Sequence, residues 1–468
     1  MKSNNKFNNI RIHFIGIGGI GMSGIAELMF DLGYKIQGSD ININSNISRL
    51  KKRGIIFYKG HNKANIKEIN AAVFSSAIKK NNPELLECKR LKIPIVSRAD
   101  MLGELMKFKK SIAIAGSHGK TTTTSLVGSM LDRGKFDPTI INGGIINSYS
   151  KNNRFGLSEW MVVEADESDG SFLRLPHQIN IITNLDSEHL DFYKSKENLN
   201  NAFLNFINNI PFYGYSILCI ESENLKKLSK KIKTRNIITY SINQKDSDVI
   251  IKTIKKNKKN TEFTLVFNKK IIKDFNKKII FKSTLLGEHN ILNATGAIIA
   301  SLLVKVSISS IKKALVNFQG VKRRFTFLGK LGKAYIYDDY AHHPSEIRAS
   351  FEIAKQISEK KIIVVFQPHR YSRTNYLYDD FIKILKKIKY LFILDIYPAG
   401  EKPIKKINSY NIVKQLNKTN KNVFYLKDIK LIRNKLNPYL NENNSIIFMG
   451  AGSITYLANS LFDKKNDK

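Results

Sequence analysis

The stretch at residues 116–124 reads Gly-Ser-His-Gly-Lys-Thr-Thr-Thr-Thr, between an apolar run at residues 111–115 and a helix-like segment. A glycine-rich turn from strand to helix aims backbone N–H groups at phosphate oxygens, because the first N–H groups of a helix lack partners within it. Lys120 can reach the terminal phosphates of a nucleotide, and the Thr121 hydroxyl can ligate Mg²⁺. The stretch therefore predicts a phosphate-binding loop, and ATP as the nucleotide that the protein uses. Its predicted nucleotide-binding residues are Gly116, Ser117, His118, Gly119, Lys120, Thr121 and Thr122.

This loop departs from the general phosphate-loop pattern in one place. The first glycine of that pattern is expected five residues before Gly119, where this chain has Ile114. A glycine-rich turn between a strand and a helix also occurs without any ligand, so the motif by itself leaves both readings open.

A second glycine-rich turn follows the apolar residues 10–15 and reads Gly-Ile-Gly-Gly-Ile-Gly at residues 16–21. A helix-like segment at residues 22–30 and a strand-like one at residues 34–40 come next, the latter ending on Asp40. This is the spacing of a dinucleotide-binding fingerprint, in which an acidic residue lies about 20 positions beyond the turn. A tight turn that only packs the helix on the strand is the alternative.

Strand-like and helix-like segments alternate along the whole chain, which indicates parallel sheets covered by helices. We expect three α/β domains: a Rossmann-like domain at residues 1–108, a central ATPase domain of the phosphate-loop type at 109–321, and a Rossmann-like domain at 322–468. Within residues 249–286, short β-branched and aromatic runs predict antiparallel hairpins at the edge of the central sheet.

Acidic and histidine side chains follow two predicted strands of the central domain. Glu164 opens an acidic run after the strand at residues 160–163, and His189 follows the strand at residues 179–183. Because ligands bind at the carboxyl edge of a parallel sheet, we expect Glu164 and His189 to converge with Thr121 on metal ions. Capping of helix N-termini is the alternative role for the acidic run.

The third domain repeats this arrangement with basic side chains. The strand at residues 334–337 leads to Asp339, Tyr340 and His342, and the strand at residues 362–366 leads to Arg370 and Arg373. Paired guanidinium groups suit a carboxylate or a phosphate because each can form two charge-assisted hydrogen bonds. Surface ion pairing is the alternative for the arginines.

Composition limits the classes of protein that the chain can belong to. With 468 residues, 42% of them hydrophobic, it can form several cores, and no apolar run approaches the length of a membrane span. Only two cysteines, Cys88 and Cys219, occur, so we expect a reducing cytoplasm and no disulfide. The net charge is +38, and the lysines are spread along the whole chain, mixed with Asn and Ile. These three residues have A/T-rich codons, so we attribute the excess of lysine to base composition and expect no nucleic-acid partner.

Taken together, the ordered motifs resemble those of the Mur ligases, over nearly the whole chain, and most closely the alanine-adding branch. The resemblance is carried by segments at residues 13–26, 117–123, 164–169, 289–293, 323–325, 338–344 and 366–373. It implies an ATP-dependent ligase that adds L-alanine to UDP-N-acetylmuramate through an acyl phosphate, in peptidoglycan precursor synthesis. There are two alternatives. One is the branch of the family that attaches a recycled tripeptide to the same nucleotide, and the other is an NAD-dependent dehydrogenase.

The resemblance also implies a role for individual residues. The first glycine turn would hold a UDP-sugar, with Gly16, Gly18, Gly19, Gly21, Met22 and Asp40 as its binding residues. Lys120, Glu164, His189 and Arg324 would be catalytic, with Thr121, Glu164 and His189 around Mg²⁺. Further ATP-binding positions would be Asn290, Asn293, Arg324 and Asp339, and the amino acid would contact Tyr340, His342, Arg370 and Arg373. The family's frequent modified lysine has no counterpart, because residues 197–225 contain no lysine.

Overall fold

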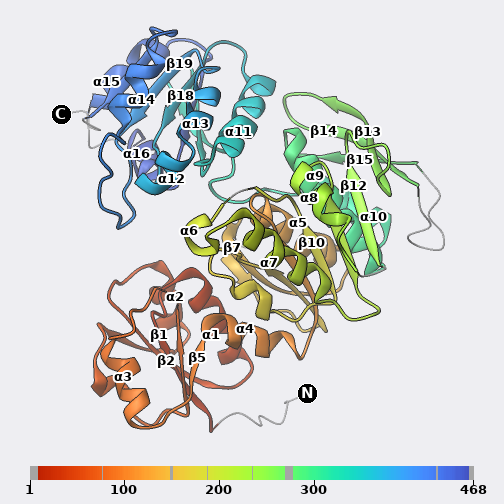
Figure 1. Cartoon of the computed structure of the whole chain (residues 1–468), viewed down its shortest axis with the longest axis vertical. Helices are drawn as coiled ribbons and strands as arrows, with labels where there is room; N and C mark the ends of the chain where they lie inside the picture. Colours follow the sequence, from red (N-terminus) through yellow and green to blue (C-terminus); the bar gives the residue numbers. More distant parts are fainter. Residues whose placement is uncertain are drawn as a thin grey trace. The chain divides into compact units, whose positions relative to one another are not determined.

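The computed structural model describes residues 9–75, 77–147, 151–186, 188–233, 236–268, 278–427 and 431–462. Its strands form three separate sheets of five, ten and six strands, coloured in chain order in Figure 1. Each of the three predicted α/β domains contains one of these sheets, so the predicted three-domain α/β architecture is confirmed. The exact boundaries at residues 108 and 321 stay a prediction.

The first sheet is parallel throughout, with the order β3-β2-β1-β4-β5. Its strands are β1 (Arg11–Ile15), β2 (Lys35–Asp40), β3 (Ile56–Lys59), β4 (Ala71–Phe74) and β5 (Ile95–Ser97). Its helices are α1 (Ile20–Asp31), α2 (Ser45–Lys52), α3 (Pro83–Arg90) and α4 (Arg98–Met106), with the short 3-10 helix η1 (Lys63–Asn65). The predicted strand, turn, helix and strand around the first glycine turn are all present.

The second sheet has the order β15-β14-β13-β12-β11-β10-β6-β9-β7-β8. Its strands are β6 (Lys110–Ala115), β7 (Thr139–Ile146), β8 (Lys151–Arg154), β9 (Trp160–Glu164), β10 (Ile179–Ile182), β11 (Tyr215–Cys219), β12 (Ile237–Ser241), β13 (Val249–Lys256), β14 (Thr261–Phe267) and β15 (Lys278–Ser283). Its helices are α5 (Lys120–Arg133), α6 (Leu190–Tyr193), α7 (Lys196–Asn208), α8 (Glu223–Ser229), α9 (Glu288–Leu303) and α10 (Ile308–Val316), with η2 (Ser171–Arg174). The predicted edge strands β13, β14 and β15 lie at one end of this order.

The third sheet has the order β16-β17-β21-β18-β19-β20 and is parallel except for β16, which runs antiparallel to β17. Its strands are β16 (Thr326–Leu331), β17 (Ala334–Asp339), β18 (Ile362–Phe366), β19 (Tyr390–Leu394), β20 (Val423–Leu426) and β21 (Ser445–Met449). Its helices are α11 (Pro344–Ile357), α12 (Tyr371–Tyr376), α13 (Tyr378–Leu385), α14 (Ser409–Leu416), α15 (Ile432–Leu436) and α16 (Ile454–Ser460), with η4 (Asn437–Tyr439).

Six strands were not predicted from the sequence, namely β3, β7, β8, β12, β16 and β20. Strand β7 contains Asn142, Gly143 and Gly144, residue types that are uncommon in strands. Strand β16 is interrupted by a register shift between Phe327 and Gly329 where it pairs with β17. Their hydrophobic patterns are broken at these points, so only pairing with a neighbouring strand makes them part of a sheet.

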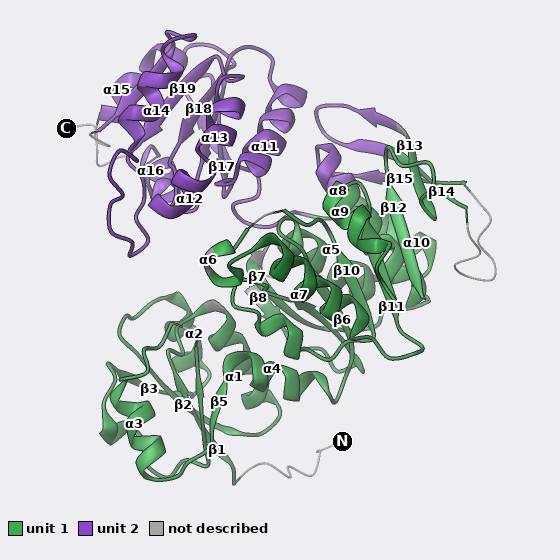
Figure 2. Ribbon diagram, viewed as in Figure 1, with its two compact units in different colours: residues 1–253, 263–281, 292–318 green, residues 254–262, 282–291, 319–468 purple. Residues whose placement is uncertain are grey.

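The chain divides into two compact units, shown in different colours in Figure 2. The first comprises residues 1–253, 263–281 and 292–318, and the second comprises residues 254–262, 282–291 and 319–468. Cys88 and Cys219 are buried, and both are free thiols. Within the part of the chain that is described, no helix is long and apolar enough to cross a bilayer.

Candidate active site

The first glycine turn joins β1 to α1 at the carboxyl edge of the first sheet. The backbone N–H groups of Gly16 and Ile17 donate to the carbonyl of Ser39, at 2.8 and 3.0 Å. The N–H of Gly18 donates to Oδ2 of Asp40 at 2.9 Å. Gly16 has a φ of 82°, which glycine adopts readily and other residues rarely do. The end of β2 therefore holds the turn in shape.

The other residues predicted for the UDP-sugar differ in what they can offer a ligand. Gly19 is exposed, whereas the Met22 side chain is only 1% exposed and belongs to the hydrophobic core. Met22 therefore offers almost no accessible surface to a ligand. Beside Gly21 lies the guanidinium group of Arg98, so close that a Cβ atom there would be 2.7 Å from Nη1. The turn thus offers backbone N–H groups at the start of α1, flanked by a cation.

The phosphate loop connects β6 to α5, which begins at Lys120. Gly116 and Gly119 have φ values of 131° and 83°, so both occupy backbone conformations that suit glycine. Ile114, the residue in place of the expected first glycine, is fully buried within β6, between Ile181 and Glu164 of the neighbouring strands. The loop is therefore short because the strand continues one residue beyond that position.

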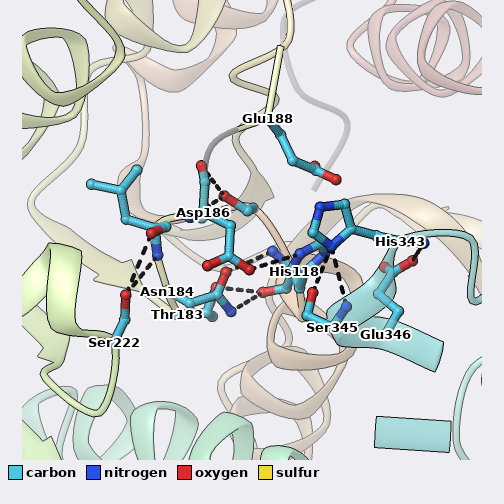
Figure 3. A network of polar contacts seen from close by, with 12 residues as sticks. His118, Thr183, Asn184, Asp186, Glu188, Ser222, His343, Ser345 and Glu346 are labelled. Atoms are coloured by element: carbon cyan, nitrogen blue, oxygen red, sulfur yellow. Dashed lines mark hydrogen bonds and ion pairs between the residues drawn. The ribbon is translucent and has the colours of Figure 1, made fainter. Parts of the chain in front are cut away.

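Residues that follow β10 form hydrogen bonds with the phosphate loop. Asn184 accepts a hydrogen bond from the backbone N–H of His118 and donates one to its carbonyl, both at 2.9 Å, and Thr183 donates to that carbonyl at 2.6 Å. The hydroxyl of Ser117 accepts from the N–H of Asp186 at 2.8 Å. Figure 3 shows Thr183, Asn184 and Asp186 arranged around His118. These bonds fix the loop without using the N–H groups at the start of α5.

Lys120 lies beside the acidic run that follows β9. Its Nζ is 2.8 Å from Glu167 and 2.6 Å from the carbonyl of Gly116. Burial alone would lower the pKa of Lys120, but the carboxylates of Glu167, Glu164 and Asp166 raise it above its ordinary value. Burial raises the pKa of Glu167 to about 7, against the opposing charge of Lys120. Lys120 therefore remains positively charged at neutral pH.

Two groups of residues that are common metal ligands lie near this lysine. The Thr121 hydroxyl donates to Oε1 of Glu164 at 3.1 Å, while Oε2 of Glu164 accepts from the N–H of Gly143 at 2.7 Å. Nε2 of His189 is 3.7 Å from Glu167 and 3.8 Å from Glu188. Ligand atoms of Glu167, Glu188 and His189 lie within 4.8 Å of one another. His189 has a φ of 57°, a strained conformation for this residue.

Thr121 and Glu164 thus lie together as predicted, whereas His189 lies with two carboxylates that the sequence did not single out. Oxygen ligands such as hydroxyl and carboxylate suit Mg²⁺. Glu167 and Glu188 are therefore added to the candidate site. In the sequence these two residues are distinguished only by their positions, Glu167 within the acidic run that Glu164 opens and Glu188 directly before His189.

Asn293 meets the phosphate loop from α9. A Cβ atom at Gly119 would clash with Oδ1 of Asn293, so the amide lies against the start of α5. Asn293 is itself only 6% exposed. Asn293 thus lies at the phosphate loop, its contact with a nucleotide stays a prediction, and the close approach adds a second reason, besides the positive φ, for glycine at position 119.

In the second compact unit, the predicted nucleotide-binding residues Asp339 and Arg324 lie at the end of β17, whereas Asn290 lies at the start of α9. Asp339 is buried, accepts from the N–H of Ala341 at 3.0 Å, and has a pKa that burial raises to about 6. Arg324 stacks over Tyr340 at 5.5 Å and approaches Glu346 at 3.5 Å. Asn290 donates to the carbonyl of Leu286 at 2.8 Å.

The residues predicted for the amino acid form a basic and aromatic cluster in the same unit. Rings of Tyr340 and His342 lie 5.1 Å apart, and His342 is 5.8 Å from His369. Nη1 of Arg373 is 3.3 Å from Nδ1 of His369. Arg370 has a φ of 67°, and its backbone N–H donates to the carbonyl of Tyr397 at 2.8 Å. Tyr340, His342 and Arg373 therefore share one cluster, and Arg370 adjoins it.

His369 and Tyr397 complete this cluster and were not predicted as site residues. Their rings are stacked, with centroids 5.5 Å apart. Burial, with a smaller contribution from the neighbouring His342, Arg373 and Arg370, lowers the pKa of His369 to about 4. A neutral imidazole thus lies among positively charged guanidinium groups, an arrangement that suits a ligand carboxylate.

Models of three protein-family domains match the chain. These are the "Mur ligase family, catalytic domain" at residues 11–110, the "Mur ligase middle domain" at 114–301 and the "Mur ligase, glutamate ligase domain" at 323–452. Among curated proteins, the chain is 45% identical to the UDP-N-acetylmuramate–L-alanine ligase of Rickettsia felis, over 96% of this chain and 95% of that one. It is 44% identical to the enzyme of that name from Bartonella tribocorum, with the same coverage.

Solved structures show the same likeness. The UDP-N-acetylmuramate–alanine ligase of Thermotoga maritima superposes with a TM-score of 0.79 at 27% identity, over 97% of this chain and 98% of that one. A murein peptide ligase from Psychrobacter arcticus superposes with a TM-score of 0.70 at 22% identity and the same coverage, which is a likeness of fold.

Proposed function

The chain belongs to the Mur ligase family, and on this premise we propose that it is an ATP-dependent ligase that joins L-alanine to UDP-N-acetylmuramate. The observation that carries the proposal is the phosphate loop, where Lys120 and the Thr121–Glu164 pair lie together at the start of α5. A loop of this kind binds the phosphates of a nucleotide and supplies positive charge to them.

The proposed reaction has two steps. An oxygen of the muramate lactyl carboxylate attacks the γ-phosphorus of ATP, so a P–O bond forms to the carboxylate and the bond to ADP breaks. The alanine amine then attacks the acyl carbon, loses a proton, and displaces inorganic phosphate as the amide bond forms. The Lys120 ammonium neutralises negative charge on the transferred phosphoryl group. The phosphoryl group competes with the carboxylate of Glu167 for this ammonium.

Mg²⁺ is the proposed cofactor, with Thr121 and Glu164 as one set of ligands and His189, supported by Glu167 and Glu188, as the other. The oxygen atoms of Thr121 and Glu164 fit that ion, since hydroxyl and carboxylate groups are hard ligands. When bound, the ion would draw negative charge from the phosphate oxygens.

The remaining roles follow the three sheets. We assign the UDP-sugar to the glycine turn between Gly16 and Gly21 at the end of the first sheet, with Asp40 holding the turn. Asn293 at the phosphate loop, together with Asn290, Arg324 and Asp339, is assigned to the nucleotide. The basic cluster of Tyr340, His342, Arg370 and Arg373 is assigned to the carboxylate of alanine.

Phosphate release from ATP in the presence of UDP-N-acetylmuramate tests this function. L-Alanine, glycine, L-serine and the recycled tripeptide are compared as acceptors, and the product mass identifies the amide. We expect L-alanine to give the highest kcat/KM. A preference for the tripeptide would assign the chain to the recycling branch, and a lack of phosphate release with every acceptor would contradict the ligase assignment. We place the reaction in the cytoplasm and expect no nucleic-acid partner.

A further inference from the structure

A fully buried carboxylate lies beneath the glycine turn of the first sheet. Glu84 is the second residue of α3, its side chain has no exposed surface, and the N-cap residue Asn82 accepts from its backbone N–H at 2.9 Å. A charge in this position is costly unless several donors surround it. The residues around Glu84 therefore form a built polar network rather than an accident of packing.

Three side chains donate hydrogen bonds to this carboxylate, one from the end of β2 and two from the segment after β3. Ser39 at the end of β2 donates to Oε2 at 2.6 Å, and Nδ1 of His61 is 2.9 Å from the same oxygen. Asn65 donates to Oε1 at 2.6 Å. Burial by itself would raise the pKa of Glu84, but the neighbouring His13, Ser39 and Asn65 outweigh it and hold the pKa at about 2.

The buried His13 on β1 extends the same network. Its Nε2 is 3.5 Å from Oε1 of Glu84, and its Nδ1 is 3.3 Å from the side-chain amide of Gln37 on β2. Gln37 also donates to the backbone carbonyl of Asn65 at 3.0 Å. Strands β1 and β2, the segment after β3 and the start of α3 are thus joined through one carboxylate.

This network determines which nitrogen of His61 carries the proton. Because the Ser39 hydroxyl donates to Glu84, and Nδ1 of His61 is within 3.0 Å of both Ser39 and Glu84, Nδ1 has to be the N–H donor. The imidazole is 11% exposed, and within the described chain its Nε2 has no hydrogen-bond partner. In the neutral ring, Nε2 is then an acceptor at the carboxyl edge of β3.

The network also reaches the glycine turn directly. The carbonyl of Ser39 accepts from the N–H groups of Gly16 and Ile17, and the next residue, Asp40, accepts from that of Gly18. A shift of Ser39 would therefore move the acceptors that hold the turn. Among the described residues Glu84 forms no hydrogen bond or ion pair with a predicted site residue, and the partner through which it reaches the turn is Ser39.

We propose that Glu84 is a positioning residue for the UDP-sugar: it fixes Ser39 beneath the glycine turn and keeps His61 in the Nδ1–H tautomer before the substrate binds. The inference rests on the proposed function for the identity of that substrate. Preorganisation of this kind raises affinity, because the ligand does not have to order the groups that receive it.

The substitution Glu84→Gln tests the proposal in the full-length protein. All three neighbours donate to Glu84, so an amide NH₂ group must face at least one donor and cannot satisfy both sides of the site. We expect the KM for UDP-N-acetylmuramate to rise about tenfold or more, with kcat and the KM values for ATP and L-alanine within about twofold of wild type. The matched control is Glu87→Gln on the same helix, because Glu87 pairs with Arg90 outside the network.

A measurement on the free protein separates this inference from the proposed function. Imidazole ¹⁵N chemical shifts of histidine-labelled protein should give the Nδ1–H tautomer for His61 in wild type, and a loss of that preference in Glu84→Gln. The Nε2–H tautomer in wild type, or an unchanged KM for the UDP-sugar in Glu84→Gln, would overturn the proposal even if ligation is confirmed. If Glu84→Gln does not fold, Ser39→Ala decides: it keeps the carboxylate, and it must raise the same KM.

Discussion

Nζ of Lys120 lies 2.8 Å from the carboxylate of Glu167, inside the loop that the sequence identifies as a phosphate site. The two residues are 47 positions apart in the chain and meet because β6 and β9 are neighbours in the sheet. Before ATP binds, the lysine charge is thus balanced by an internal carboxylate. A phosphate at this loop would compete with Glu167 and the carbonyl of Gly116 for the N–H donors of Lys120.

Lys120→Ala should abolish ligation while leaving the affinity for UDP-N-acetylmuramate within about twofold of wild type. Removing one preorganised charge from a transferring group typically costs about 10²–10³ in rate. The glycine turn lies on a different sheet, so it should be unaffected. Phosphate release and calorimetric binding of the UDP-sugar measure the two effects. Lys110→Ala is the control, since Lys110 is on β6 but pairs with Glu159 at the surface. Near-normal ligation by Lys120→Ala would refute the role.

Removal of Lys120 should also lower stability, because Glu167 would be left buried without its partner. Breaking a buried ion pair by deleting one member costs roughly 3–5 kcal/mol. The double variant Lys120→Ala/Glu167→Gln should recover a large part of that loss. Urea denaturation of the single and double variants measures it, and equal stabilities for the two would show that the pair is not coupled.

His189→Ala and Glu188→Gln should increase the Mg²⁺ concentration required for half-maximal ligation. His189, Glu188 and Glu167 have ligand atoms within 4.8 Å of one another, so the loss of one weakens any ion held by the others. A Mg²⁺ titration at saturating ATP is the measurement, with the exposed Glu197→Gln on α7 as the control. An identical Mg²⁺ requirement in both variants would assign these residues a structural role.

Arg370→Lys and Arg373→Lys should raise the KM for L-alanine by roughly ten- to a hundredfold. A charge-assisted hydrogen bond contributes about 1.5–3 kcal/mol, and a lysine cannot reproduce the planar guanidinium fork. Initial rates with each of the three substrates varied in turn locate the effect. If both substitutions changed only the KM for ATP or for the UDP-sugar, these arginines would serve a different ligand.

Acid should reduce the contribution of Glu84 to stability. The pKa of this carboxyl is about 2 in the folded protein against an ordinary value of 4.5, so its contribution is fully present above pH 4.5 and is lost as the pH falls towards 2. Linkage gives a loss of roughly 2 kcal/mol by pH 3. The difference in unfolding free energy between wild type and Glu84→Gln should therefore shrink between pH 6 and pH 3. A constant difference would mean that Glu84 is not ionised in the folded state.

Local chain chemistry was enough to predict the three-domain α/β architecture and the proximity of Thr121 to Glu164. Apolar runs ending in glycine turns predicted β1, β6 and the helices after them, since such turns require positive φ and free N–H groups at a helix start. Polar residues placed just beyond strand ends predicted Thr121 with Glu164, because parallel strands end at a common edge. Strand β7, in contrast, was missed because Gly143 and Gly144 interrupt its pattern.

What only the tertiary structure decided is which polar group meets which partner. The acidic run after β9 contains several carboxylates, and nothing local distinguishes Glu167, which pairs with Lys120, from Glu164, which pairs with Thr121. Met22 directly follows the glycine turn and was predicted to bind the UDP-sugar, yet its side chain lies in the hydrophobic core. Glu84 is 45 residues from Ser39 and gave no signal at all. Strand order and helix packing set these long-range contacts, and a short stretch of sequence carries no information about the residues that will be folded against it.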